Sequence, residues 1–248
     1  AICGETIDYG PCAFMDEYNP DQVFSSIDHS GRYKYSNQPK VAMWNLSRLA
    51  ETLLPLIADK PEDAVQDAEK VIESFNSHYD NFFRKLMIKK IGISPLNSCE
   101  EPKLFKHAQT FLAILKAQKA DFTNSFRSLP NYLNGTTIPK DLNAPTLSEE
   151  LKAWIRDWKS ILKQHNFEKN KTLEILSSSN PFIIPRNHQV EKSLLESVQN
   201  YKIGVTEFKS FKRLVEALLE PFKENPNNRD LSLPPKESEK IHETFCGT

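Results

Sequence analysis

Glycine and cysteine are both scarce in this sequence. Only 7 of the 248 residues are glycine, less than half of the usual share of about 7%. Because tight hairpin turns between strands depend on glycine, this scarcity favours helices. The cysteines form neither a C-x-x-C pair nor a zinc-finger spacing, and they are too scattered for a disulfide scaffold. They are Cys3, Cys12, Cys99 and Cys246. A reducing compartment is therefore expected.

Net charge and long apolar runs are also missing. The 32 basic and 33 acidic residues give a formal net charge of -1, so no overall field attracts nucleic acid or an anionic membrane. No apolar run approaches the roughly 20 residues that a membrane span needs. Apolar residues make up 39% and charged residues 26% of the chain, as in an ordinary globular protein. We therefore expect a packed core, and neither a nucleic-acid nor a membrane partner.

The first 40 residues differ from the rest of the chain. They are rich in aromatic residues and turn formers and show no helical period. We predict a short strand over residues 1–7 and an irregular loop over 8–39. A loop of this length is uncommon in a compact domain unless it is functional or disordered, and its aromatic content argues against disorder.

From Val41 onward the apolar residues recur at helical spacing, which predicts a mainly α fold. Pro61 is typical of the first turn of a helix, and Thr146 to Glu149 reads as a capping box. Turn formers predict a loop or joint over 130–145. Helices are predicted near 41–54, 61–92, 105–115, 122–129, 147–162, 187–201 and 208–219. The domain organisation is then an N-terminal segment 1–40, a helical body 41–221 and a polar tail 222–248.

Aromatic residues at helical spacing are core residues by default. On this ground we place Trp154 and Trp158 in the core, together with the pair Phe82 and Phe83. Trp44, on the first predicted helix, is assigned to the core as well.

The sharpest motif is the segment 6–11, Thr-Ile-Asp-Tyr-Gly-Pro. An acidic residue that ends a strand and is followed by an aromatic residue and glycine is the arrangement in which kinases hold a metal ion on the nucleotide phosphates. The same tripeptide also occurs in plain turns, so Asp8 alone is weak evidence. Three longer motifs extend the pattern, at 28–33 (Asp-His-Ser-Gly-Arg-Tyr), 44–50 (Trp-Asn-Leu-Ser-Arg-Leu-Ala) and 180–188 (Asn-Pro-Phe-Ile-Ile-Pro-Arg-Asn-His).

In this order, the motifs closely resemble the selenoprotein O family, and the resemblance covers essentially the whole chain. It implies an atypical protein-kinase fold that transfers AMP from ATP to Ser, Thr or Tyr hydroxyls of client proteins. Asp8 matches the family's metal-binding aspartate, which holds Mg²⁺ or Mn²⁺ and also contacts the nucleotide. The expected fold is the C-terminal lobe of such a kinase-like protein, with additional helices and an irregular N-terminal loop segment.

Other parts of the family's active site have no counterpart in this chain. The family's general base and second metal ligand form an Asp-Asn dipeptide upstream of the stretch that begins here, and its Gly-rich loop and phosphate-contacting lysine lie further upstream. The first residues, Ala-Ile-Cys-Gly, carry no initiator Met and no signal-peptide pattern. We therefore expect a piece of a longer enzyme that is inactive alone and needs the missing N-terminal lobe as its partner.

The remaining polar candidates have plainer interpretations. Asp28 and His29 are expected to shape the loop, which corresponds to a kinase activation segment in the resembling family and could position substrate there. Asn45 and Arg48 are expected to tie that loop to the helical body. A lone arginine and histidine make a poor metal site, so Arg186 and His188 are expected to cap or anchor a helix start.

Family members often carry a redox-active cysteine at the extreme C-terminus, which makes Cys246 a candidate redox residue. Its nearest potential partner in the activation-like segment is Cys12, although Phe24 stands closer to the place where a partner is expected. The resemblance implies a cytoplasmic protein in a bacterium and allows a mitochondrial one in a eukaryote.

Two alternatives remain open at the level of sequence. One is a stand-alone helical module that binds a partner or senses redox state without catalysis. The other is a fragment of a true kinase, which would transfer the γ-phosphate instead of AMP.

Overall fold

The computed structural model describes residues 13–94, 99–164 and 167–244. Its α-helices are α1 (Gln38–Ile57), α2 (Pro61–Lys90), α3 (Glu101–Gln118), α4 (Phe122–Arg127), α5 (Leu129–Asn134), α6 (Glu149–Gln164), α7 (Lys169–Ser179), α8 (Asn187–Lys202), α9 (Lys209–Leu219) and α10 (Arg229–Ser232). In these ranges the only β pairing consists of two isolated bridges, Glu17 with Asp121 and Ser25 with Thr244. The prediction of a mainly α fold is confirmed.

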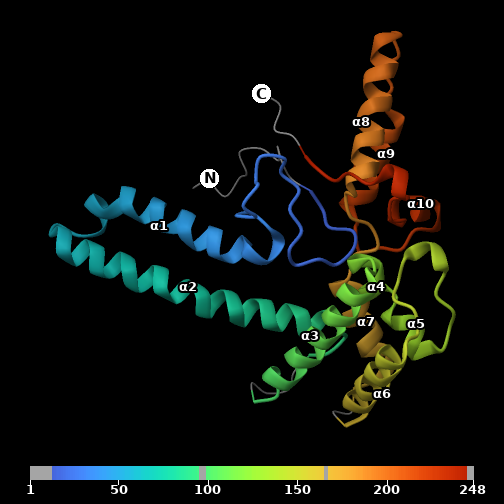
Figure 1. The fold of residues 1–248 in the computed structure, drawn as a ribbon, viewed down its shortest axis with the longest axis horizontal. Helices are drawn as coiled ribbons and strands as arrows, with labels where there is room; N and C mark the ends of the chain where they lie inside the picture. The colour runs from blue at the N-terminus through green and yellow to red at the C-terminus, as the bar shows by residue number, and fades with distance from the viewer. Residues whose placement is uncertain (1–12, 95–98, 165–166, 245–248) are drawn as a thin grey trace.

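Two helical hairpins project from a compact body. Figure 1 shows α1 and α2 extending together to one side, and α8 and α9 extending together in a different direction. Helices α3 to α7 form the body from which both hairpins leave. The irregular segment before α1 crosses the region between the two hairpins, so it contacts elements that are far apart in the sequence.

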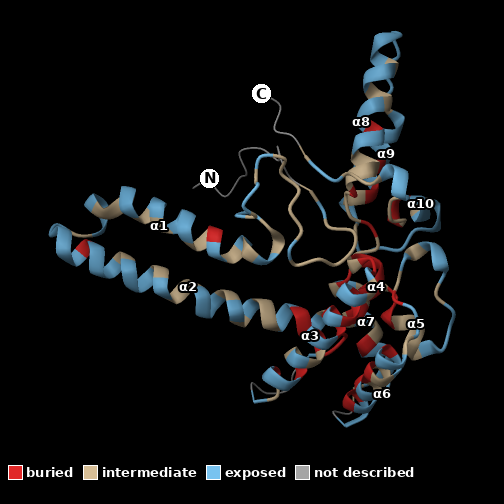
Figure 2. Cartoon of the chain, in the orientation of Figure 1, coloured by how far each residue is buried: buried red, intermediate tan, exposed pale blue. Residues whose placement is uncertain are grey.

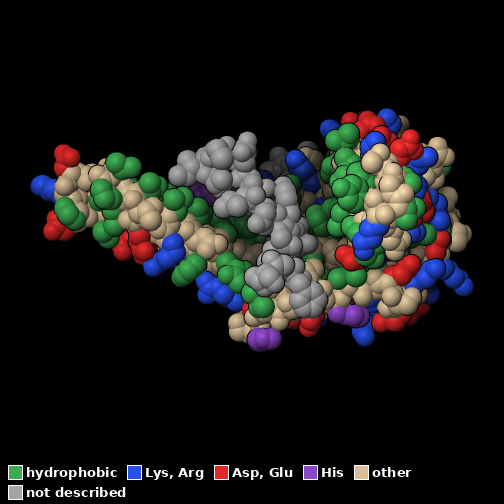
Figure 3. Space-filling model, turned by 90° about the horizontal axis from the view of Figure 1, so that it is seen from above, with side chains coloured by type: hydrophobic (Ala, Val, Ile, Leu, Met, Phe, Trp, Pro, Cys, Tyr) green, Lys and Arg blue, Asp and Glu red, His purple; other side chains and the backbone are tan. Residues whose placement is uncertain are grey.

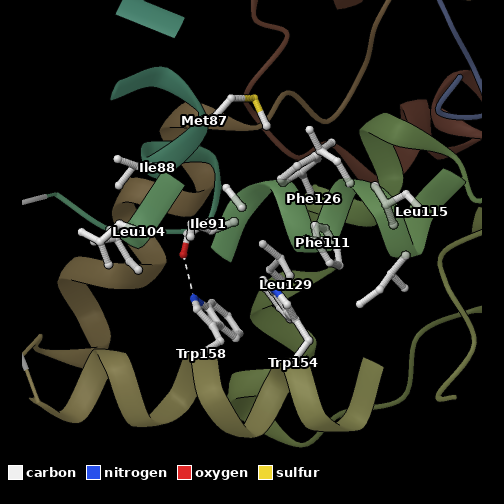
Figure 4. Close-up of a cluster of buried hydrophobic side chains, with 14 of the residues drawn as sticks. Met87, Ile88, Ile91, Leu104, Phe111, Leu115, Phe126, Leu129, Trp154 and Trp158 are labelled. Atoms are coloured by element: carbon white, nitrogen blue, oxygen red, sulfur yellow. Dashed lines mark hydrogen bonds between the residues drawn. The ribbon is translucent and has the colours of Figure 1, made fainter. Parts of the chain in front are cut away.

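The main core lies in the body, where the end of α2 meets α3, α4, α6 and α7 (Figure 2). Trp154 and Trp158 of α6 are buried there beside Phe111 of α3 (Figure 4). Each indole N–H has a carbonyl acceptor, since Trp158 Nε1 donates to Ile91 O at 2.9 Å and Trp154 Nε1 donates to His107 O at 2.9 Å. The two tryptophans are thus core residues, as predicted, and bury no unpaired donor.

Two helix starts were predicted from capping signals, with different outcomes. Pro61 is the first residue of α2, as predicted. The predicted capping box at Thr146 was wrong, because α6 begins at Glu149 and Ser148 accepts the cap hydrogen bond from Leu151 N at 3.2 Å. Thr146 instead binds the side chain of Gln118, at 2.8 Å from its N and 3.0 Å from its Oγ1. Two threonine or serine candidates stood close together, and the tertiary contact with α3 decided between them.

Some predicted segments also need correction. The stretch 130–145 is not all loop, because α5 continues to Asn134. Helix α7 occupies 169–179, a stretch for which no helix was predicted from the sequence. The predicted strand over 1–7 lies outside the described residues.

Two aromatic residues assigned to the core are exposed. Trp44 is 47% exposed and Phe82 is 62% exposed, whereas Phe83 packs against the core. The α1/α2 hairpin is only two helices thick, so each helix is covered by its partner on one side alone (Figure 2). Helical spacing therefore identified the apolar residues of this hairpin but not which of them are covered.

Gly92, directly after α2, allows the closest approach of α7 to the end of that helix. Its φ is +76°, and a Cβ there would lie 2.8 Å from Leu176 Cγ. Gly135 has a similar φ of +69° but no heavy atom within 4 Å of its Cβ position. The two glycines thus share the left-handed backbone and differ in packing.

We expect Gly92→Ala to destabilise the chain more than Gly135→Ala. Both substitutions pay roughly 1–2 kcal/mol for a left-handed non-glycine residue. Gly92→Ala should add about 1–3 kcal/mol, because Leu176 must move to avoid overpacking. Urea denaturation of both variants measures the difference, and equal losses of stability would contradict this account of Gly92.

Candidate functional site

The described part of the candidate site is the segment that follows the motif at 6–11. Asp8, Cys12 and Cys246 lie outside the described residues, so their predicted roles stay predictions. From Ala13 the segment is described, and it runs without regular structure until the short 3₁₀ helix Tyr35–Asn37. Its position depends on contacts with the helical body, chiefly with the residue that precedes α8.

Arg186 holds two carboxylates from distant parts of the chain. Its Nη1 lies 2.7 Å from Asp121 Oδ2 and its Nη2 lies 3.1 Å from Asp121 Oδ1, a bidentate pair. Nη1 also donates to Asp16 Oδ1, eight residues beyond Asp8, and Nε donates to Ser232 O at 3.1 Å. The side chain of Arg186 is 1% exposed and that of Asp121 is fully buried. This cluster of Asp16, Asp121 and Arg186 is called the anchor below.

Two members of the anchor, Asp121 and Arg186, directly precede helices. Asp121 is the N-cap of α4, with extended backbone, and accepts a hydrogen bond from Asn124 N at 2.7 Å. Arg186 precedes α8 and follows Pro185, and its backbone is extended as well. The next residue, Asn187, pairs with the backbone of Phe14, accepting from its N–H at 2.9 Å and donating to its carbonyl at 3.0 Å. Two helix starts therefore face the same stretch of the N-terminal segment.

Backbone contacts reinforce the anchor. Phe122 N donates to Asp16 O at 2.7 Å, and Tyr18 N donates to Ala120 O at 3.0 Å. The ring of Tyr18 stacks on that of Phe122, with centroids 5.7 Å apart. Residues 14–18 are thus fixed by main-chain, ionic and aromatic contacts together.

The electrostatics of the anchor suit a structural role. Burial raises the pKa of Asp121 and of Asp16, and the charge of Arg186 offsets only part of that effect. Burial acts to lower the pKa of Arg186, but the charges and hydrogen bonds of the two carboxylates outweigh it, so that this pKa is raised. The guanidinium therefore remains charged and occupies oxygens that could otherwise bind a cation.

The C-terminal end of the described chain contacts the same segment. Thr244 N donates to Phe24 O at 2.6 Å, and Ser26 N donates to Thr244 O at 3.1 Å. An ion pair of 2.9 Å joins Lys240 Nζ to Glu17 Oε1. Phe24, singled out from the sequence, therefore lies against the residues that precede Cys246 in the chain.

Asp28 shapes the loop, as predicted. Its Oδ1 accepts from Arg32 N at 2.8 Å, and its Oδ2 accepts from Tyr33 N at 2.8 Å. The hydrogen bond from Tyr33 is the main reason why the pKa of Asp28 is lowered. These contacts account for the carboxylate without a catalytic role.

The link between the loop and α1 differs from the predicted one. Arg32 stacks on Trp44, with its guanidinium carbon 4.5 Å from the ring centroid. Arg48 instead pairs with Glu51 on its own helix, at 2.7 Å. Among the described residues, Arg48 contacts the Trp44 ring and Glu51 of its own helix, and neither Arg48 nor Asn45 forms a hydrogen bond or ion pair with residues 13–34, so the predicted tie is not made there. The exposed Trp44 is the residue of α1 that meets the loop.

No group of three or more metal-ligating side chains occurs in the part of the chain that the structure describes. Arg186 is an anchoring residue, as predicted, and its neighbour His188 is half-buried beside Gln189, whose Nε2 lies 3.1 Å from His188 Nε2.

None of the helices in the described ranges is long and apolar enough to cross a membrane.

Comparison with known proteins identifies the family. A family model described as "Protein adenylyltransferase SelO" matches residues 1–218. The chain belongs to the SelO family. The "Protein nucleotidyltransferase YdiU" of Bacillus cereus strain G9842 is 40% identical over 247 residues, which is 100% of this chain and 48% of the relative. The proteins of the same name from Clostridium botulinum strain Alaska E43 and Maridesulfovibrio salexigens are 40% and 38% identical, with 47% and 48% of each relative covered.

This SelO-family chain spans about half the length of the curated relatives it matches. Sequence reasoning found the family and Arg186, but it missed Asp16 and Asp121 as the partners of that arginine. Asp121 carries a usable signal, since an aspartate just before a helical run is a common N-cap. No signal in the sequence pairs it with Arg186, which lies 65 residues away.

We expect Arg186→Gln to cost about 3–5 kcal/mol of stability, because it leaves the buried carboxylate of Asp121 and the partly buried one of Asp16 without their cation. Arg213→Gln is the matched control. Arg213 also forms a two-pronged pair with Asp230, at 2.8 Å on one side, but its side chain is 44% exposed, so its loss should cost under about 1 kcal/mol. Urea denaturation gives both values, and hydrogen exchange at the Tyr18 and Phe122 amides should rise only in the Arg186 variant. Similar losses of stability in both variants would show that the anchor contributes no more than an exposed ion pair.

Proposed function

We propose that this chain supplies the metal-binding segment and the helical support of a protein adenylyltransferase. In the complete enzyme, AMP would pass from ATP to a Ser, Thr or Tyr hydroxyl of a client protein, and pyrophosphate would leave. The chain would correspond to the C-terminal lobe of an atypical kinase-like fold, with the hairpins as additional helices. The family match over residues 1–218, at half the length of the relatives, carries this proposal.

Asp8 is the residue of this chain that we assign to the metal and the nucleotide. A Mg²⁺ or Mn²⁺ ion bound there would neutralise phosphate charge and orient the triphosphate. One carboxylate does not provide the ligand set for a metal and a triphosphate. The general base and the remaining ligands that the family resemblance implies have no counterpart here, so we propose that the isolated chain does not catalyse transfer.

The anchor fixes the chain a few residues after Asp8. Transfer to a hydroxyl requires the phosphate and the incoming oxygen to be held in line, and small displacements are costly. Arg186 fixes Asp16 eight residues after Asp8, and Asn187 fixes Phe14 six residues after it. We propose that these contacts position the metal-binding segment against the helical body.

Labelled ATP tests the proposal. The isolated chain and the full-length Bacillus cereus relative would each be incubated with Mg²⁺, a protein substrate such as casein, and ATP labelled at the α- or the γ-phosphate. We expect α-label on protein with the relative only, and loss of at least about 100-fold when the relative's aspartate aligned with Asp8 becomes Asn, since that removes a metal ligand.

Three outcomes would contradict the proposal. Transfer by the isolated chain would show that the missing half is not needed. Transfer of the γ-label would indicate a kinase. Full activity of the Asn variant would remove Asp8 from the metal site. For the isolated chain, calorimetric titration with ATP and Mg²⁺ should show no saturable binding below millimolar concentrations.

A further inference from the structure

The α8/α9 hairpin carries an apolar face that no described residue covers. On α8 the face consists of Leu194, Leu195, Val198 and Tyr201, and on α9 it consists of Phe211, Val215 and Leu219. These residues follow helical spacing, so they form one stripe on each helix. The exposed fractions reach 69% at Tyr201 and 76% at Leu219. We refer to these seven residues as the α8/α9 face.

The opposite side of the hairpin is already packed. Leu214 and Ala217 of α9 are buried with Ile183 and Leu231 in a second, smaller core. The hairpin therefore does not need the α8/α9 face in order to attach to the body. Figure 3 shows hydrophobic side chains gathered along the side of this hairpin that is nearer to α1 and α2. A contiguous apolar surface of this kind marks an interaction site more often than a free surface.

We propose that the α8/α9 face is the docking surface for the half of the SelO-family protein that lies outside this chain. The relatives are about twice as long as the region they share with it, since the chain covers 47% to 48% of them. Each relative therefore has a stretch of comparable length outside the shared region, and this stretch is the occupant that we assign to the face. This inference rests on the proposed function, which assigns the rest of the active site to the part of the protein that lies outside this chain.

The path of the N-terminal segment favours this occupant. Phe14 is joined by two hydrogen bonds to Asn187, the first residue of α8. At Phe14 the N-terminal segment therefore passes the foot of the hairpin that bears the apolar face. A domain connected to that point would be held close to the face, and its high effective concentration would favour docking over binding of a separate molecule.

The charges around the face fit a protein surface better than a lipid one. The two helices carry both signs, with the acidic residues Glu191, Glu196 and Glu216 interspersed among the basic residues Lys192, Lys202, Lys209, Lys212 and Arg213. A helix that lies on an anionic membrane has a polar face rich in Lys and Arg. A polar rim of mixed sign around an apolar centre is instead the usual anatomy of a protein interface.

Side-chain footprinting with hydroxyl radicals tests whether the face is covered. The isolated chain and the full-length Bacillus cereus relative are compared at the aligned positions of α8 and α9, with rates corrected for the side chain present. We expect modification at least fivefold slower in the relative at positions such as Tyr201 and Phe211. Leu147, 57% exposed and located before α6, is the control and should react at similar rates. Equal rates at the face would overturn the proposal.

Substitution separates the missing half from a second copy as the occupant. Val198→Glu with Val215→Glu should leave the urea midpoint of the isolated chain unchanged, because both side chains are exposed there. The same double change at the aligned positions of the relative should lower its midpoint, while Leu147→Glu changes neither protein. An unaffected relative would overturn the proposal. Light scattering that shows an isolated-chain dimer, abolished by the double change, would assign the face to a second copy instead. None of these measurements depends on nucleotide transfer.

Discussion

The buried guanidinium of Arg186 is the interaction on which the arrangement of the N-terminal segment depends. A buried cation is tolerated only when it is paired and hydrogen-bonded, and here the pairing brings two carboxylates from separate regions of the chain to Arg186. Asp16 lies 170 residues before Arg186, and Asp121 lies 65 residues before it. Because Arg186 and Asp121 are buried, the guanidinium needs its protein partners, and its bond to Asp16 fixes the segment after residue 12 relative to α4 and α8. The contacts of Phe14, Tyr18 and Phe122 then follow from that position.

The body and the two hairpins have different kinds of surface. The body buries its own aromatic residues and satisfies their N–H groups, so it needs no partner for its core. The two hairpins differ from the body, because in each hairpin some apolar residues lie on sides that the partner helix does not cover. This SelO-family chain, which spans about half the length of its relatives, thus combines a body with its own core and two hairpins with exposed apolar sides. The proposed division of the active site, with one metal ligand in this chain, parallels this division of the fold.

Most helices could be predicted from the sequence, and the reasons are local. Pro61 sets the start of α2, and the apolar spacing of α6 places Trp154 and Trp158 in the core. The errors occurred where a local signal had two readings. Thr146 and Ser148 are both capable caps, and the contact of Thr146 with Gln118 decided the outcome. The turn formers after α4 suggested a loop, yet α5 forms there because Leu129 is fully buried against the body.

The sequence by itself determined the mainly α fold and the family. These depend on periodicity, on capping residues and on the order of short motifs, all of which are local properties. Only the tertiary structure decided that Arg186 binds Asp16 and Asp121, that Arg32 meets Trp44, and that the α8/α9 face stays open. A helical pattern indicates that a helix has an apolar side. Which residues cover that side, and which charged residues form pairs, depends on how the chain folds between residues that are distant in sequence.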